Sequence, residues 1–167
     1  MTTRRHFLAL ALGATALAPF TATPVLAQAT PIGSIQVVFT PNVMAAWGPA
    51  HTAVVKAELE STLAELLGPS LRRGAGTRLV IAVSSIWFGA FAGGGGGGKP
   101  KDGGGDNDYL ESTVTLYDRS GRELASWPIR STEGMGGGAW YLPDIDQRRL
   151  KALARNNAYW IKRYVGA

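Results

Sequence analysis

The pattern of apolar and polar residues predicts four strands along the chain. Residues 35–40 and 109–117 alternate between apolar and polar, which is typical of strands with one buried face, and residues 123–130 form the strand that returns after 109–117. Residues 77–88 differ, because they contain the unbroken apolar run 79–83. Such a run is typical of a central strand, and we expect it to be buried on both faces.

The last two strands are predicted to form a hairpin. The turn between them, residues 118–121, begins with Asp118 and ends with Gly121, as a type I turn prefers. Pro128 has no amide hydrogen to donate to a neighbouring strand, so we expect the strand that contains it to lie at an edge of the sheet.

Apolar residues at helical spacing predict two helices. The first runs from Pro49 to Leu67, and Gly68 and Pro69 stop it. Its predicted buried face is formed by Val55, Leu59, Leu63 and Leu66. The last helix follows Asp144, which suits the N-cap, and Asp146 adds negative charge near the N-terminus. Its predicted buried stripe is formed by Leu150, Leu153, Trp160, Ile161 and Tyr164.

These elements follow in the order β-α-β-β-β-α and predict an α+β fold. A right-handed crossover makes the first two strands parallel, and the hairpins continue the sheet antiparallel. We therefore expect a two-layer sandwich, with a mixed four-stranded sheet and two helices on one face. Residues 34–167 would form a single domain with a glycine-rich insert at 89–107, preceded by a linker at 28–33.

The chain begins with the features of an export leader. Arg4 and Arg5 precede an apolar stretch at 7–18, which is too short to span a membrane comfortably, and small residues allow cleavage after Ala27 or Ala29. The arginine pair followed by Phe-Leu resembles the twin-arginine (Tat) signal of bacteria. That resemblance implies a cleaved signal peptide at residues 1–27 and a periplasmic location. No later segment is apolar for 18 residues or more, so we expect no transmembrane segment in the mature protein.

The mature part resembles small periplasmic or lipoprotein-like βαβββα envelope domains of Gram-negative bacteria, whose function is unknown. The hairpin 116–124, with the sequence Leu-Tyr-Asp-Arg-Ser-Gly-Arg-Glu-Leu, carries most of this resemblance. The chain departs from the lipoproteins because it has no cysteine. Anchoring by a lipid is therefore not implied.

Composition narrows the chemistry that is expected. The chain has no cysteine, and only His51 remains after the leader is removed, so we expect no metal site and no cofactor. The formal charge of +5 falls to +3 without Arg4 and Arg5, and this modest charge argues against a nucleic-acid partner. No catalytic set is evident: His51 could serve Ser84 or Ser85 as a base, but nothing in the sequence brings these residues together.

The last helix is rich in basic residues, which are Arg148, Arg149, Lys151, Arg155, Lys162 and Arg163. A basic helix can meet an anionic envelope polymer or lipid. It can equally be the solvated outer face of an amphipathic helix. The sequence leaves both interpretations open.

Aromatic residues flank the two glycine-rich segments, 89–107 and 134–138, and suggest a stacking platform for a sugar or peptide. The candidate ligand-binding residues are Trp87, Phe91, Lys99, Trp140 and Tyr141. The alternative is that these aromatic rings fill the core between sheet and helices. The platform interpretation gains support if both glycine-rich segments lie at the same end of the sheet.

The function predicted from the sequence is a non-enzymatic periplasmic protein that binds or scaffolds an envelope protein or an anionic envelope polymer. One alternative is a small periplasmic hydrolase that uses His51 or the carboxylates of Asp106 and Asp108. Another is a subunit of an envelope assembly in which a partner extends an edge strand.

Overall fold

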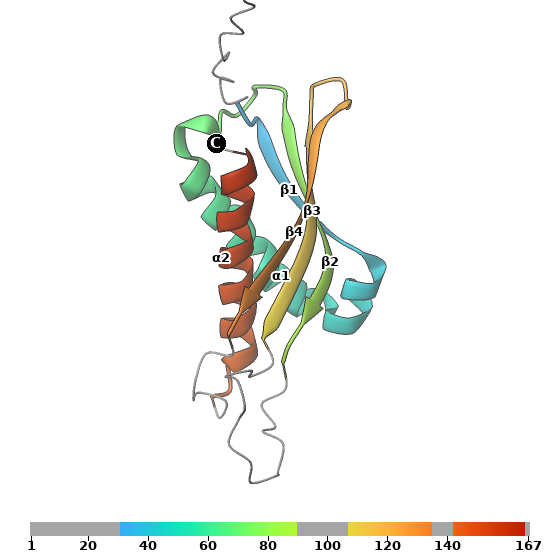
Figure 1. Ribbon diagram of the computed structural model, residues 1–167, viewed down its shortest axis with the longest axis vertical. Coiled ribbons are helices and arrows are strands. Elements are labelled where there is room, and N and C mark those ends of the chain that lie inside the picture. The colour runs from blue at the N-terminus through green and yellow to red at the C-terminus, as the bar shows by residue number, and fades with distance from the viewer. Residues whose placement is uncertain (1–30, 90–106, 135–141, 166–167) are drawn as a thin grey trace, which may run out of the picture.

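The computed structural model describes residues 31–89, 107–134 and 142–165 (Figure 1). Within them the chain follows the predicted β-α-β-β-β-α order. The elements are β1 (Ser34–Phe39), α1 (Pro41–Leu67), β2 (Arg78–Trp87), β3 (Asp108–Tyr117), β4 (Glu123–Glu133) and α2 (Ile145–Val165). A short 3-10 helix, η1 (Gly68–Ser70), follows α1.

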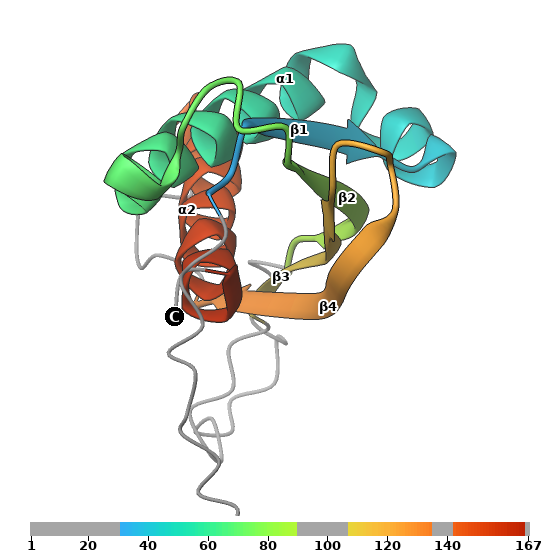
Figure 2. The same cartoon turned by 90° about the horizontal axis from the view of Figure 1, so that it is seen from above.

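The four strands form one mixed sheet in the order β1-β2-β3-β4. β1 runs parallel to β2, whereas β3 pairs antiparallel with both β2 and β4. α1 packs on β1 and β2, α2 packs on β3 and β4, and the helices pack on each other. Both helices therefore cover the same face (Figure 2), and the predicted α+β two-layer sandwich is confirmed.

The core lies between the helices and the inner face of the sheet. Leu79, Ile81 and Val83 of β2 are fully buried there. Val80 and Ala82 point to the opposite face and are only half-buried. The prediction that the run 79–83 is buried on both faces was therefore wrong, because no described element covers the outer face of the sheet.

The first helix begins earlier than predicted. α1 starts at Pro41, directly after β1, and not at Pro49. Gly48 interrupts it with a non-helical backbone, φ 68° and ψ 173°, and the helix resumes at Pro49. Glycine adopts this backbone region far more readily than other residues. The sequence Gly48-Pro49 therefore marks a break inside α1, whereas Gly68 ends it as predicted.

The buried stripe of α2 is partly different from the prediction. Leu150, Leu153 and Ile161 are fully buried as expected, but Trp160 and Tyr164 are 38% and 49% exposed. The remaining buried positions are Arg149, Ala154, Asn157 and Ala158. Trp160 is seven residues from Leu153, which is about 20° around the helix, so its exposure does not follow from helical spacing.

Hydrogen bonds form the predicted turn between β3 and β4. The amide of Gly121 donates to the carbonyl of Asp118 at 3.1 Å, and the amide of Asp118 donates to the carbonyl of Arg122 at 2.9 Å. Gly121 has a φ of 86°, which suits glycine at the last position of this turn. β4 lies at the edge of the sheet and contains Pro128, which confirms the edge prediction.

The expected leader, residues 1–27, lies outside the described residues. Three residues assigned to the linker, 31–33, are described and are bound to the domain. Ile32 is buried, its amide donates to the carbonyl of Ser70 at 2.9 Å, and its carbonyl accepts from Arg72 at 2.8 Å. Across the described parts of the chain, no helix is both long and apolar enough to span a membrane.

Candidate functional site

Both glycine-rich segments are attached to the same end of the sheet. Trp87 at the end of β2 pairs with Tyr109 near the start of β3. Asp108 at the start of β3 pairs with Glu133 at the end of β4. β2 and β4 flank β3, and both strands end at this same end of the sheet. This is the arrangement that favours the platform interpretation.

A buried ion pair lies at this end of the sheet. The guanidinium of Arg149, from α2, contacts both carboxylate oxygens of Asp108, and its Nε lies 2.8 Å from Oδ2. The same guanidinium donates to the carbonyl of Gly89 at 2.8 Å, and the amide of Gly89 donates to Asp108 at 3.0 Å. Asp108 and Arg149 are 1% and 7% exposed. Together they join α2, the end of β2 and the start of β3.

Aromatic rings extend this cluster to α1. The Arg149 guanidinium carbon lies 4.0 Å from the centre of the Phe88 ring, a cation–π contact. Phe88 meets Trp47 of α1 edge-on at 4.7 Å between ring centres. The indole Nε1 of Trp47 donates to the carbonyl of Ile86 at 3.1 Å. The cluster thus joins both helices to the sheet.

Two sequence-based assignments change as a result. Arg149 was expected on a basic surface, but it is buried and paired with Asp108. Asp108 was a candidate only in the alternative hydrolase interpretation, and both its oxygens are engaged by Arg149. The signal for Arg149 was present in the sequence, since it lies four residues before Leu153 and therefore on the buried stripe of α2.

The other basic residues of α2 are exposed, except for the half-buried Lys162, and some of them have acidic partners. Arg148 contacts Asp144 at 2.8 Å, and this hydrogen bond holds the pKa of the Asp144 carboxyl below its usual value. Arg155 reaches Glu58 of α1 at 2.6 Å, and Arg163 stacks on the ring of Trp160. Neither Lys151 nor Lys162 makes an ion pair with another described residue. The solvated-face interpretation therefore accounts for most of this helix.

The predicted aromatic site is described only in part. Trp87 is 62% exposed and lies on the outer face of the sheet. Phe91, Lys99, Trp140 and Tyr141 lie outside the described residues. Trp47 and Trp127 pack against the core, as the alternative interpretation expected.

Trp87 has neighbours on the outer face that sequence reasoning did not select. Tyr109 of β3 lies opposite it, and Thr132 of β4 lies opposite Tyr109. The guanidinium of Arg130 sits 4.6 Å from the centre of the Tyr109 ring and 3.4 Å from the Glu111 carboxylate. Alternation along β3 and β4 could have placed these side chains outward, but only the register shows which of them are neighbours.

His51 does not form a catalytic set with Ser84 or Ser85. Its Nδ1 lies 2.9 Å from the carbonyl of Trp47, and its ring packs edge-on against the Trp47 indole. Ser84 donates its hydroxyl to the carbonyl of Glu111 at 3.3 Å. Within the described chain, no hydrogen bond joins His51 to Ser84 or Ser85.

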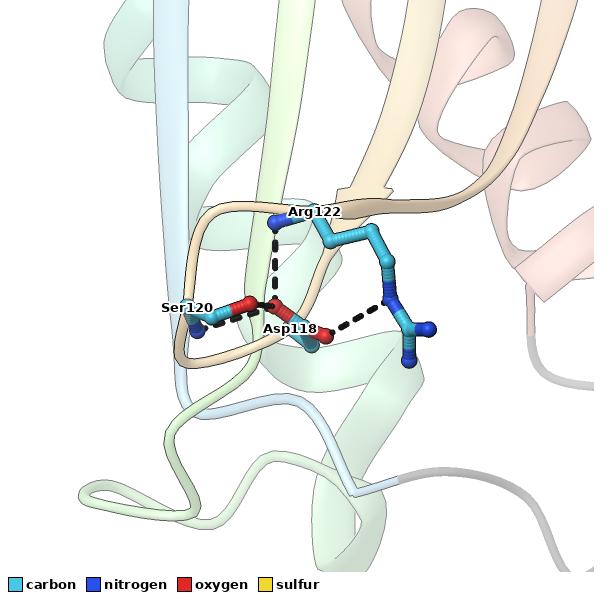
Figure 3. Close-up of polar contacts among 3 residues, drawn as sticks. All are labelled: Asp118, Ser120 and Arg122. Atoms are coloured by element: carbon cyan, nitrogen blue, oxygen red, sulfur yellow. Dashed lines mark hydrogen bonds and ion pairs between the residues drawn. The ribbon is translucent and has the colours of Figure 1, made fainter.

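The β3–β4 turn, at the other end of the sheet, is a compact polar structure (Figure 3). One Asp118 oxygen accepts from the Ser120 amide, the Ser120 hydroxyl and the Arg122 amide at 2.9, 2.6 and 3.0 Å. The other accepts from Arg122 Nε at 3.1 Å. The pKa of Asp118 is lowered, first by the Ser120 hydroxyl and then by the backbone amides and Arg122.

No protein-family model matches this sequence, and no curated protein matches it. Three solved structures show similarity of backbone shape. A candidate lipoprotein from Caulobacter crescentus CB15 is 15% identical, with 78% of this chain and 86% of that chain covered and a TM-score of 0.41. An uncharacterized protein is 11% identical, with 80% and 90% covered and a TM-score of 0.49. The PelC dodecamer from Paraburkholderia phytofirmans is 16% identical, with 83% and 90% covered and a TM-score of 0.47. At these levels of similarity, no property of those proteins is carried over to this chain.

Proposed function

We propose that this protein is a non-enzymatic binding protein of the cell envelope and that the outer face of its sheet binds a glycan. The observation that carries the proposal is the surface formed by Trp87, Tyr109, Arg130, Glu111 and Thr132, which we call the outer aromatic surface. No described element covers it. Trp87 exposes 62% of its area there, which is unusual for so large an apolar side chain.

The chemistry of the outer aromatic surface fits a sugar. A pyranose ring has an apolar face of C–H groups that stacks on an aromatic ring, and an edge of hydroxyl groups that needs hydrogen-bond partners. Trp87 and Tyr109 offer the rings, while Arg130 and Glu111 offer a donor and an acceptor beside them. Thr132 adds a hydroxyl in register with Tyr109.

The envelope location in this proposal rests on the expected leader at residues 1–27. Its paired Arg4 and Arg5 and its short apolar stretch are the features of an exported chain. An exported protein meets the polysaccharides of the envelope and of the cell surface. The proposed ligand class therefore agrees with the expected compartment.

The bonds of the candidate catalytic groups support a binding role. Asp108 is held in the buried pair with Arg149, so it would have to break that pair to act as an acid or base. His51 directs its Nδ1 to a carbonyl four residues earlier in its own helix. Neither group is arranged as an acid or base with a neighbouring nucleophile.

Glycan binding can be tested by calorimetric titration of the protein without residues 1–27, which we call the periplasmic form. The titrants are soluble fragments of envelope and capsular polysaccharides. We expect Trp87→Ala to weaken binding about tenfold or more, because truncation of a Trp that anchors a binding surface costs about 2 kcal/mol or more. Trp160→Ala is the matched control, since Trp160 is also exposed but lies on α2.

The two variants distinguish binding at the outer aromatic surface from binding elsewhere. Loss of affinity in Trp87→Ala together with unchanged affinity in Trp160→Ala supports the outer aromatic surface. Equal affinities in all three proteins, or no binding to any glycan in the panel, would contradict the proposal. Circular dichroism and a urea unfolding curve verify that each variant is folded.

A further inference from the structure

A second candidate binding site lies at the opposite end of the sheet from the buried ion pair. There the loop between α1 and β2 approaches the β3–β4 turn and the start of β1 (Figure 1). These segments enclose an open pocket of about 570 Å³. Its wall includes Gly74, Gly76, Thr77, Arg78, Arg119 and Ser120. The volume lies in the usual range for a small-molecule site.

Glycine at position 76 makes room for an arginine of the pocket. A Cβ atom placed on Gly76 would lie 3.3 Å from both Cβ and Nε of Arg119, which is closer than most side chains tolerate. Gly76 also has a φ of 84°, a left-handed backbone that favours glycine. The Arg119 side chain therefore packs directly over the backbone of the α1–β2 loop.

The acid in the pocket wall does not neutralise its arginines. Asp118 is the carboxylate of the wall, and its hydrogen bonds all go to Ser120 and Arg122 of its own turn (Figure 3). Arg78 contacts the ring of Tyr117 at 5.5 Å. Within the described chain, neither Arg78 nor Arg119 makes an ion pair. The pocket wall thus carries two positive charges that Asp118 does not pair with.

The surroundings add to this positive charge. Arg72 and Arg73 belong to the same α1–β2 loop and are exposed. Arg72 donates to the carbonyl of Pro69 at 3.4 Å and does not meet an acid among the described residues. Charges of one sign around a concave site attract a ligand of the opposite sign.

We propose that this pocket binds an oxyanion, such as a phosphate group, with Arg78 and Arg119 as its two guanidinium ligands. A guanidinium presents parallel N–H donors that match two oxygens of a phosphate or carboxylate. Glycines in the wall let the anion approach the backbone closely. This proposal does not depend on the outer aromatic surface, because it concerns other residues at the other end of the sheet.

The test is calorimetric titration of the periplasmic form with inorganic pyrophosphate in a buffer of low ionic strength. We expect the double variant Arg78→Gln/Arg119→Gln to bind at least about tenfold more weakly than the parent protein, since it loses two charge-assisted contacts. The control is Arg148→Gln/Lys151→Gln, which lowers the net charge by the same amount at exposed positions of α2 that do not line the pocket. We expect it to bind within about twofold of the parent.

A second arm identifies the source of the oxyanion. Co-sedimentation with phosphatidylcholine vesicles that contain phosphatidylglycerol, with and without pyrophosphate, shows whether a lipid phosphate occupies the same pocket. Vesicle binding that pyrophosphate displaces, and that Arg78→Gln/Arg119→Gln loses, supports the pocket with a lipid as the source. Pyrophosphate binding without vesicle binding supports a soluble ligand. Equal losses in the two double variants, or no binding of pyrophosphate or vesicles by the parent protein, would overturn the proposal.

Discussion

Burial decides what the charged residues of this protein do. Asp108 and Arg149 are removed from water and meet through several hydrogen bonds, so each is costly to leave without the other. Arg148 and Arg155 also have acidic partners, but in solvent, where such pairs contribute little. Arg78 and Arg119 stay exposed without an acidic partner among the described residues. The same residue type thus serves the core, the solvated surface and a candidate binding site.

Breaking the buried pair should destabilise the protein strongly. We expect Asp108→Asn to lower the free energy of unfolding by about 3 kcal/mol or more, because it leaves the Arg149 charge buried without its counterion. Urea unfolding followed by fluorescence measures this loss. Glu60→Gln is the control, because it removes only an exposed contact of 3.9 Å with Lys56. Comparable losses in the two variants would show that the Asp108 pair is not structural.

The β3–β4 turn should respond to acid. Asp118 has a lowered pKa, so its ionised form stabilises the folded state above its ordinary value of 3.8, and this contribution disappears as the pH falls through the lowered pKa. Asp118→Asn keeps an acceptor oxygen but loses the charge. We therefore expect a lower unfolding temperature than the parent protein at neutral pH, and a smaller difference at an acid pH below 3.8.

The control for this experiment is Glu65→Gln. Glu65 is an exposed carboxylate without an ion pair in the described part of the chain. It should give nearly the same unfolding temperature as the parent protein at both pH values. A difference between Asp118→Asn and the parent that stays constant with pH would show that the Asp118 charge does not stabilise the turn.

For single residues, sequence reasoning was strongest where local chemistry decides the outcome. The turn at Asp118 and Gly121 was predicted correctly, because both residues act within a few positions of themselves. The partners of Arg149 and of Trp87 were not predicted, because Asp108 and Tyr109 become their neighbours only when the sheet and α2 assemble. Contacts between distant segments depend on register, which alternation alone does not determine.

The two helices show how far helical spacing can be used to predict packing. The spacing of Leu150, Leu153 and Ile161 identified the buried side of α2 correctly. Trp160 and Tyr164 also lie on that side by helical spacing, yet they are exposed, while Ala154 and Asn157 are buried. Asn157 is accepted in the core because it hydrogen-bonds to Ser112 and Ser131. Helical spacing gives the direction of a side chain, whereas its burial depends on what packs over that part of the helix.

Truncations along α2 should distinguish its buried positions from its exposed ones. We expect Leu153→Ala to cost about 2–5 kcal/mol of unfolding free energy, since it leaves a cavity between the helices and the sheet. Trp160→Ala removes a larger side chain but should cost less than about 1 kcal/mol, because Trp160 is partly exposed. Urea unfolding measures both. A larger loss for Trp160→Ala would place that side chain in the core.

At the scale of the whole molecule, the contacts that hold together the end of the sheet next to the glycine-rich segments are made by described residues outside those segments. Gly89 and Asp108 are already joined by a hydrogen bond of 3.0 Å, and β2 and β3 are already paired at Trp87 and Tyr109. The segment between them therefore has only to connect two neighbouring points. We therefore expect the stability of the sheet not to depend on the glycine-rich insert.

Replacing residues 90–106 with a short Gly-Ser connection should leave the fold intact. We expect the free energy of unfolding to stay equal or rise by about 1 kcal/mol, since each halving of loop length saves roughly 0.6 kcal/mol of closure entropy. Thermal unfolding of the shortened protein checks this. A shortened protein that fails to fold would show that the replaced residues contribute to the core. Glycan titration of the same protein then shows whether the insert adds to the outer aromatic surface.

The parallel pairing of β1 has a consequence for the order in which the chain assembles. β3 and β4 are joined by a short turn and can form early, whereas β1 has only β2 as a strand neighbour and is separated from it by the whole of α1. Docking of β1 is therefore expected to be a late event in folding. β1 is also the strand that lies nearest the expected export leader. A chain with β1 in place is then one whose remaining sheet has already formed, so the strand that completes the fold is the one that follows the expected leader in the sequence.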